Sequence, residues 1–309
     1  MIYFNGNSLV RILDDGTRIK KYSGAFSPEQ PDNIDVKITN FCDSSTPIQI
    51  NDEISGNRVF AAGCMAHCHE KSNPNGIHGN LDLGFEVLKQ LKGGEIAIGG
   101  GSTLSHPHLS AFLRRIKQET NLIANLTVNQ YHVETQYQSI NELAAEGLFK
   151  GLGISYVKMP LDKAKLIKNC QVVWHLIAGI HTLADAELLI KEFGKPNILI
   201  LGYKEFGNGV NYYSKQKSVI DQKLKEWEWN IHTLFGRAVL GFDNLSVGQL
   251  RIRRFFSEAN WNTFYQGDDG ISSLYLDLVK EEFAQSSRSL VRFPLTKGTK
   301  FGEMLEAIK

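Results

Sequence analysis

Short apolar runs alternate with amphipathic segments along most of the chain. The apolar runs predict strands at Ile34–Asn40, Glu95–Gly99, Leu122–Asn129, Gly153–Val157, Val172–Ala178, Asn197–Tyr203 and Ala238–Asp243. Helical segments between them include Leu81–Leu91, His108–Thr120, Ser139–Glu146, Leu183–Phe193 and Ser218–Leu234. Strands and helices that alternate in this way are typical of a parallel sheet with crossover helices.

The number of these strand–helix units predicts an α/β fold, specifically a partial (β/α)6-type TIM-like barrel. Its functional groups should lie at the carboxyl ends of the strands. The flanks differ from this pattern. Ser8–Leu13 and Thr17–Tyr22 alternate around an Asp-Gly turn and predict a β-hairpin. The expected organisation is an N-terminal β-hairpin appendage (1–31), a barrel domain (32–245) and a C-terminal extension (246–309), in which Leu274–Val279 forms a hairpin or a closing strand.

Composition and charge narrow the class of protein. The chain has 309 residues, of which 42% are hydrophobic and 22% charged, as in ordinary globular proteins. With 34 basic and 33 acidic residues, the net charge of +1 gives no long-range attraction to nucleic acid or anionic lipid. No signal sequence or run of eighteen apolar residues is present. We therefore expect a cytoplasmic protein without a membrane partner.

Three of the four cysteines are grouped. Cys42 follows the first predicted strand, and Cys64 and Cys68 come before His69 and Glu70. Four cysteines are too few for a disulfide scaffold in a chain of this length, so the grouping indicates a metal site in a reducing compartment. The remaining cysteine, Cys170, is expected to be a small apolar filler beside a strand.

A glycine run follows the second predicted strand. Glu95–Gly99 leads directly into Gly100, Gly101 and Ser102, and a helix start follows near His106. Glycines after a strand often only make a tight turn, but their position after the second strand is informative.

Together the cysteines and the glycines resemble the radical S-adenosylmethionine (radical SAM) enzymes. In that family, three cysteines after the first strand hold a 4Fe-4S cluster whose fourth iron stays open for SAM, and a glycine pair after the second strand receives the methionine end of SAM. The residues that carry the likeness are Lys37–Asp43, Gly63-Cys64, His67–Glu70 and Glu95–Pro107. Most members have the spacing C-x3-C-x2-C, whereas here it is C-x21-C-x3-C, with 44–62 as an insertion. Because loop closure entropy rises slowly with length, an insertion need not abolish the site.

The resemblance also implies residue roles. Cys42, Cys64 and Cys68 would bind the cluster. SAM would be contacted by His67, Gly100, Gly101, Ser102, Asn129, Ser155, Ile177 and Gly179. His67 takes the place of an aromatic residue near adenine, and Ser102 the place of an acidic residue that faces the SAM ammonium. His175, Lys204 and Asp243 lie on the same rim and are candidates for substrate binding.

The implied activity is reductive cleavage of SAM, with a 5′-deoxyadenosyl radical that removes a hydrogen atom from a small-molecule or peptide substrate. Its electron donor would be a protein such as flavodoxin or ferredoxin. Because no cysteine follows Cys170, additional clusters are not expected.

Other interpretations of the same residues stay open. Zinc could be bound by Cys42, Cys64, Cys68 and either His69 or His67, since sulfur and imidazole ligands make a closed tetrahedral site. The chain could also be a non-catalytic barrel that binds zinc, SAM or a protein partner. A phosphate site at the glycines is less favoured, because no lysine and threonine follow them at a helix start.

Overall fold

The computed structural model describes residues 1–13, 18–22, 24, 27–43, 47–51, 58–62, 72–265, 267–271 and 273–308. Its central feature is a sheet of ten strands. In chain order these are β4 (Asn33–Thr39), β7 (Gly94–Gly100), β8 (Leu122–Asn129), β9 (Gly151–Ser155), β10 (Gln171–Ile177), β11 (Asn197–Leu201), β12 (Val239–Phe242), β13 (Ser273–Asp277), β14 (Glu282–Ala284) and β15 (Phe293–Pro294). All seven predicted strands are present.

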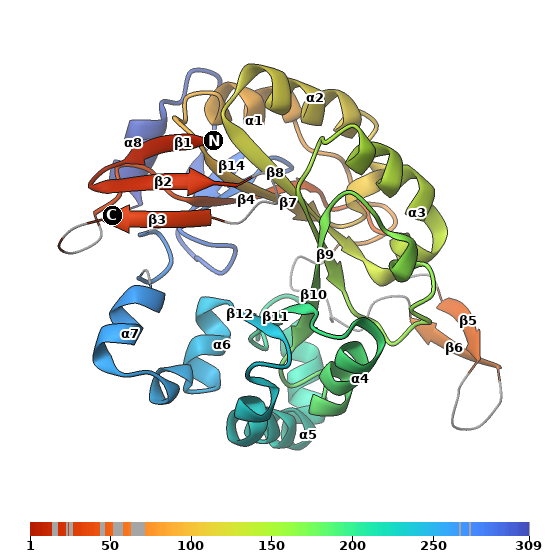
Figure 1. Cartoon of the computed structure of the whole chain (residues 1–309). Coiled ribbons are helices and arrows are strands. Elements are labelled where there is room, and N and C mark those ends of the chain that lie inside the picture. Colours follow the sequence, from red (N-terminus) through yellow and green to blue (C-terminus); the bar gives the residue numbers. More distant parts are fainter. Residues whose placement is uncertain are drawn as a thin grey trace.

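The strand order explains where functional groups gather. Strands β4 and β7 to β12 lie side by side in chain order and are all parallel, and β13 adds to the other side of β4, also in parallel. Antiparallel β14 and β15 complete the sheet. The sheet is curved (Figure 1). Among the described residues no ladder joins the edge strands β12 and β15, so the sheet is not a closed barrel. The carboxyl ends of eight parallel strands share one edge.

Five helices follow one another around the outer side of the sheet (Figure 1): α1 (Leu81–Leu88), α2 (Leu109–Glu119), α3 (Gln130–Ala145), α4 (Leu183–Phe193) and α5 (Asn208–Asn230). Shorter helices are α6 (Asn244–Gln249), α7 (Glu258–Phe264) and α8 (Phe301–Ala307). Short 3-10 helices cover Thr103–Ser105, Ala164–Leu166, Ile231–Leu234 and Ile252–Phe255. In the described parts of the chain, none of the helices combines the length and apolar character needed to cross a bilayer.

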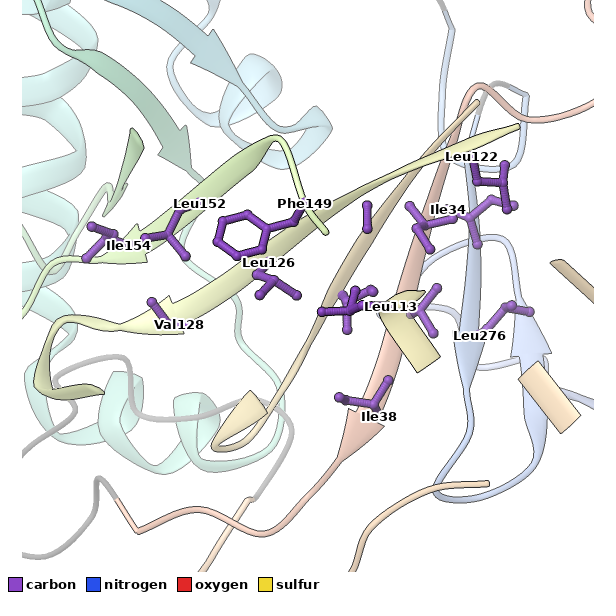
Figure 2. Close-up of a cluster of buried hydrophobic side chains, with 14 of the residues drawn as sticks. Ile34, Ile38, Leu113, Leu122, Leu126, Val128, Phe149, Leu152, Ile154 and Leu276 are labelled. Carbon is purple, nitrogen blue, oxygen red and sulfur yellow. The ribbon is translucent and has the colours of Figure 1, made fainter. Parts of the chain in front are cut away.

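The outer face of the sheet carries the hydrophobic core. Figure 2 shows side chains from several strands, among them Ile34, Leu126 and Leu152, together with Leu113 of α2 and Leu276 of β13. These side chains are almost fully buried, and burial of each contributes about 1.5–3 kcal/mol. The apolar residues that predicted the strands therefore face the helices.

The opposite, inner face of the sheet differs in chemistry. Buried and partly accessible residues alternate along β7, β8 and β11, so every second side chain points inward and can meet water. Inward residues include Asp35, Ala97, Gly99, Asn125, Thr127, Gly153, His175 and Gly241. Closed barrels fill this space with layers of branched apolar side chains. Here polar residues and glycines share the inner face with apolar side chains such as Val173 and Leu199.

The N-terminal segment forms a separate three-stranded antiparallel sheet of β1 (Ile2–Asn5), β2 (Ser8–Ile12) and β3 (Arg18–Tyr22). The predicted hairpin is β2 with β3, and β1 adds a strand that the sequence pattern did not reveal. The sheet attaches beside the amino end of β4, where Asn5 Nδ2 donates to Asp32 Oδ1 at 2.9 Å and Lys20 pairs with the same carboxylate.

The sequence between Cys42 and Cys64 contains a further hairpin. β5 (Pro47–Asn51) and β6 (Arg58–Ala62) pair in an antiparallel ladder and project away from the main sheet (Figure 1). The region identified as an insertion therefore has its own secondary structure.

Candidate functional site

The carboxyl ends of β4 and β7 are joined by main-chain hydrogen bonds. Gly101 N–H donates to Thr39 O at 2.9 Å, and Ser102 N–H donates to Phe41 O at 2.7 Å. A Cβ atom at Gly101 would overlap the carbonyl of Phe41, and Gly100 has a positive φ of 128°. The two glycines are thus required by the close approach of these chains. A contact between them and SAM stays a prediction.

Cys42 is half-buried at this junction. Its N–H donates to Asn73 O at 2.9 Å, and Asn73 N–H donates back to Asn40 O at 3.0 Å. Cys64, His67 and Cys68 lie outside the described residues. The description resumes at residue 72, and Asn73 lies beside Cys42.

Because of the β5–β6 hairpin, the long spacing between Cys42 and Cys64 in the sequence does not require a long distance in space. Pro47 pairs with Ala62, so the two ends of the hairpin lie side by side. Directly paired Cα atoms in an antiparallel ladder are about 4.5–5.5 Å apart. Outside the hairpin, residues 43–46 and 63 alone separate Cys42 from Cys64 in the sequence. Of the 21 intervening residues, those in β5 and β6 form two paired strands whose outer ends, Pro47 and Ala62, lie side by side.

Asp43, Ser102 and His132 form a compact polar group next to Cys42. Asp43 N–H donates to Ser102 Oγ at 3.0 Å, the Ser102 hydroxyl donates to the Asp43 carboxylate, and His132 Nε2 lies 2.9 Å from Asp43 Oδ1. Burial raises the pKa of Asp43, but the hydrogen bonds from Ser102 and His132 outweigh burial and leave the pKa lowered. The carboxylate is therefore ionised at neutral pH.

The order of these three groups excludes a hydrolytic triad, because the Ser102 hydroxyl contacts the carboxylate and not the imidazole. Their role is to hold the residue after Cys42 against the end of β7 and the start of α3. The expected contact of Ser102 with the SAM ammonium stays a prediction; in the structure the Ser102 hydroxyl donates to Asp43. Sequence reasoning missed Asp43 and His132, which are 89 residues apart.

A second polar contact supports the same junction. Thr39 Oγ1 lies 3.0 Å from His78 Nδ1, and His106 Nε2 lies 3.0 Å from Gly79 O, with the two imidazole rings 4.9 Å apart. Burial lowers the pKa of both histidines, so both are neutral at pH 7. They therefore join β4, the 72–79 segment and the turn before α2 without adding charge.

The other residues expected to contact SAM occupy the ends of the next strands. Asn129 ends β8, and its side-chain oxygen accepts from Tyr131 N–H at 2.9 Å to cap α3. Ser155 ends β9 and is half-buried. Ile177 ends β10, and Gly179 follows it with a φ of 90° that favours glycine. The structure thus places these residues along one edge, in the order expected.

The three candidate substrate residues lie on the inner face and its rim. Asp243 caps α6, accepting from Ser246 N–H at 2.7 Å and Gly202 N–H at 2.9 Å. Burial, and then the charge of Lys204, lower the pKa of His175 to about 4. Lys204 therefore lies within electrostatic range of His175, and the imidazole is neutral at pH 7.

Asp35, on the inner face of β4, was not singled out in the sequence. Its side chain is exposed at the surface of the inner face, but the protein around it displaces part of the surrounding water and raises its pKa to about 6; Lys204 lowers the pKa, whereas Asp269 and Asp243 raise it. These groups therefore lie within electrostatic range of Asp35 across the inner side. The signal that could have found it was the alternation of Ile34 and Val36 with charged residues, which places Asp35 opposite the core.

Removing this charge is expected to stabilise the protein. The folded-state pKa of Asp35 exceeds the usual Asp value, so its ionisation costs stability as pH rises from about 4 to 6 and the cost persists above that. Taken in full, this rise in pKa corresponds to about 3 kcal/mol. The Asp35 side chain is exposed to water, however, and screening reduces the cost to about 1 kcal/mol. Asp35→Asn should raise the free energy of unfolding by that amount at pH 7.5 and not at pH 4, measured by urea unfolding. The exposed Asp162→Asn is the control; equal effects of both variants at pH 7.5 would contradict this account.

Within the described residues, no group of three or more His, Cys, Asp and Glu side chains is arranged to hold a metal ion. Two of the three predicted cysteine ligands lie outside that part of the chain. Comparison with protein-family models and with curated proteins found no match.

Proposed function

We propose that the protein is a radical SAM enzyme built on a partial (β/α) barrel of the TIM type. The observation that carries the proposal is the junction of β4 and β7. It places Cys42 beside the glycine turn at the carboxyl edge of a parallel sheet, through the contacts of Ser102 with Phe41 and Asp43. Gly100 comes 58 residues after Cys42 in the sequence, and the pairing of β4 with β7 brings the two to the same edge.

The thiolates in the sequence and the connectivity of the chain support a 4Fe-4S cluster with three ligands. Cys42 is held at the edge by its main-chain bond to Asn73, five residues after Cys68 in the sequence. Five residues span at most about 18 Å, so chain connectivity allows Cys68 to reach the same space. Within the insertion, the pairing of β5 with β6 likewise brings Pro47 and Ala62 side by side. Cys42, Cys64 and Cys68 would hold the cluster and leave one iron open for SAM.

The chemistry supplied by the bound cluster and SAM is a one-electron cleavage that yields a 5′-deoxyadenosyl radical. Residues of this chain would position the bound SAM. Asn129, Ser155, Ile177 and Gly179 offer contacts along the edge, and the inner face holds the substrate below them. We expect a flavodoxin or ferredoxin to supply the electron and the protein to act in the cytoplasm.

The test is anaerobic reconstitution of the full chain with iron and sulfide. We expect iron-sulfur absorbance in the visible range, an electron paramagnetic resonance signal after reduction with dithionite, and 5′-deoxyadenosine after addition of SAM. A colourless protein with stoichiometric zinc and no deoxyadenosine would overturn the proposal and favour a non-catalytic barrel in which the same thiolates bind zinc.

A further inference from the structure

The two faces of the N-terminal sheet differ in what covers them. Buried and exposed side chains alternate along β1 and β2. The covered face carries Tyr3, Val10 and Ile12, which pack against Ile123 of the main sheet. An antiparallel sheet with one covered face usually presents polar side chains on its other face. The exposed face of this sheet does not follow that pattern.

Four large apolar side chains lie on the exposed face. Ile2, Phe4, Leu9 and Ile19 are 64%, 68%, 36% and 49% exposed. Phe4 is the direct ladder partner of Leu9, and Arg11 is the direct partner of both Ile2 and Ile19. Side chains that are paired in this way have Cβ atoms about 4.5–5.5 Å apart. The apolar side chains are therefore neighbours, and exposed apolar patches of this kind often mark interaction sites.

Two cations complete this surface. Arg11 lies between Ile2 and Ile19, and Lys21 lies beside Leu9. In the part of the chain that the structure describes, neither cation has an acidic partner, whereas Lys20 on the covered face pairs with Asp32. We call the exposed surface the outer patch; it consists of Ile2, Phe4, Leu9, Arg11, Ile19 and Lys21, and contains no acidic residue. Because a buried cation without a partner is unfavourable, a molecule that covers the outer patch must supply anions.

This requirement argues against a second copy of the chain and against a bilayer. Two outer patches face to face would bring cations together without acidic groups between them. The patch is also only two strand spacings wide, about 10 Å, whereas a stable dimer buries about 800 Å² per partner. In a bilayer, insertion of Ile2 and Ile19 would draw Arg11 between them away from the anionic headgroups.

The spacing across the strands matches that of a helix. Ile2, Arg11 and Ile19 lie on three adjacent strands, so Ile2 and Ile19 are about 10 Å apart. Residues i and i+7 of an α-helix are about 10.5 Å apart along its axis, and residues i+3 and i+4 lie between them on the same face. A helix that crosses the strands can therefore present an apolar side chain, a carboxylate and a second apolar side chain in the required order.

We propose that the outer patch binds a short acidic amphipathic helix of a partner protein. Apolar side chains of that helix pack against Ile2 and Ile19, and a carboxylate between them pairs with Arg11. Phe4 and Leu9 extend the apolar contact, and Lys21 attracts further acidic groups. The proposal is independent of SAM cleavage, because the N-terminal sheet attaches at the amino end of β4 and Cys42 follows its carboxyl end.

Fluorescence anisotropy with two labelled synthetic peptides tests the proposal. Both are alanine-rich helices with leucine at positions i and i+7; one has glutamate at i+3 and i+4, and the other has lysine there. The wild type should bind the glutamate peptide at least about 10-fold more tightly, because like charges across an interface strongly oppose binding. Arg11→Glu combined with Lys21→Glu should reverse this preference. The matched control, Lys191→Glu combined with Lys195→Glu, changes two exposed cations of another region and should keep it.

A second variant tests the apolar contact. Phe4→Ser should weaken binding of the glutamate peptide by about 5-fold or more and leave the melting temperature unchanged, because this side chain is already exposed. Failure of the wild type to bind the glutamate peptide, or the same preference in wild type and the Arg11/Lys21 variant, would overturn the proposal. Sedimentation velocity and phosphatidylglycerol vesicles provide the remaining outcomes. A dimer or vesicle binding that Phe4→Ser abolishes would assign the patch to a second copy or to lipid instead.

Discussion

Replacing Cys42 by alanine should abolish both cluster binding and SAM cleavage. Cys42 is the predicted ligand held at the β4–β7 junction, and a cluster that leaves one iron open needs all three thiolates. Changes outside the ligand shell of metal sites already cost about 10–100-fold, so loss of a ligand should reduce deoxyadenosine formation by at least about 100-fold. The measurements are iron and sulfide content, visible absorbance and deoxyadenosine yield after anaerobic reconstitution.

Cys170→Ala is the matched control. Cys170 directly precedes β10 at its amino end, opposite the candidate site, and burial raises the pKa of its thiol to about 11. Such a thiol stays protonated at neutral pH and is a poor metal ligand. The variant should reconstitute and cleave SAM as the wild type does. Activity that survives in Cys42→Ala but disappears in Cys170→Ala would show that the wrong thiols were chosen.

The strands could be predicted because burial imposes a simple pattern on them. Leu122–Asn129 and Asn197–Leu201 were found nearly to the residue, since a parallel sheet covered by helices requires apolar side chains on its outer face. The pairing of β13 with β4 could not be predicted. It joins segments about 240 residues apart, and no local pattern specifies such a partner.

The helices show where local patterns fail. α3 and α5 were predicted to begin at Ser139 and Ser218, but they begin at Gln130 and Asn208. Both contain a kink shortly before the predicted start, at Gln136 and Gln216. The turns before each kink are polar and aromatic and lack a regular apolar period, so only the second half of each helix carried a recognisable signal.

The candidate site was predictable in outline only. Motif positions indicated Cys42 and the glycine turn, but not that Gly100 and Gly101 are needed for contact with the main chain of β4. Nor did they indicate that Ser102 would be bound to Asp43. Asp35 was overlooked because the role of a charged residue in a strand can be inferred only once the face of the sheet on which its side chain lies is known.

Replacing Lys37 by methionine should cause the largest loss of stability. Lys37 Nζ and Asp277 Oδ2 are 3.0 Å apart, and their side chains are only 5% and 3% exposed. The two residues are direct partners in the β13–β4 ladder. Methionine keeps the volume but leaves the buried Asp277 charge uncompensated, which costs about 3–5 kcal/mol. This is a large part of the stability of a typical domain, about 5–15 kcal/mol. Urea unfolding followed by circular dichroism gives the difference.

Two further variants show whether the lost charge is the cause. Lys89→Met removes a half-exposed lysine that pairs with Glu86 at 2.7 Å, and it should cost no more than about 1 kcal/mol. Lys37→Met combined with Asp277→Asn removes the uncompensated charge and keeps a side-chain oxygen for the N–H groups of Val279 and Lys280. It should recover about 2 kcal/mol relative to Lys37→Met alone. If Lys37→Met costs no more than Lys89→Met, the attachment of β13 to β4 does not depend on this ion pair.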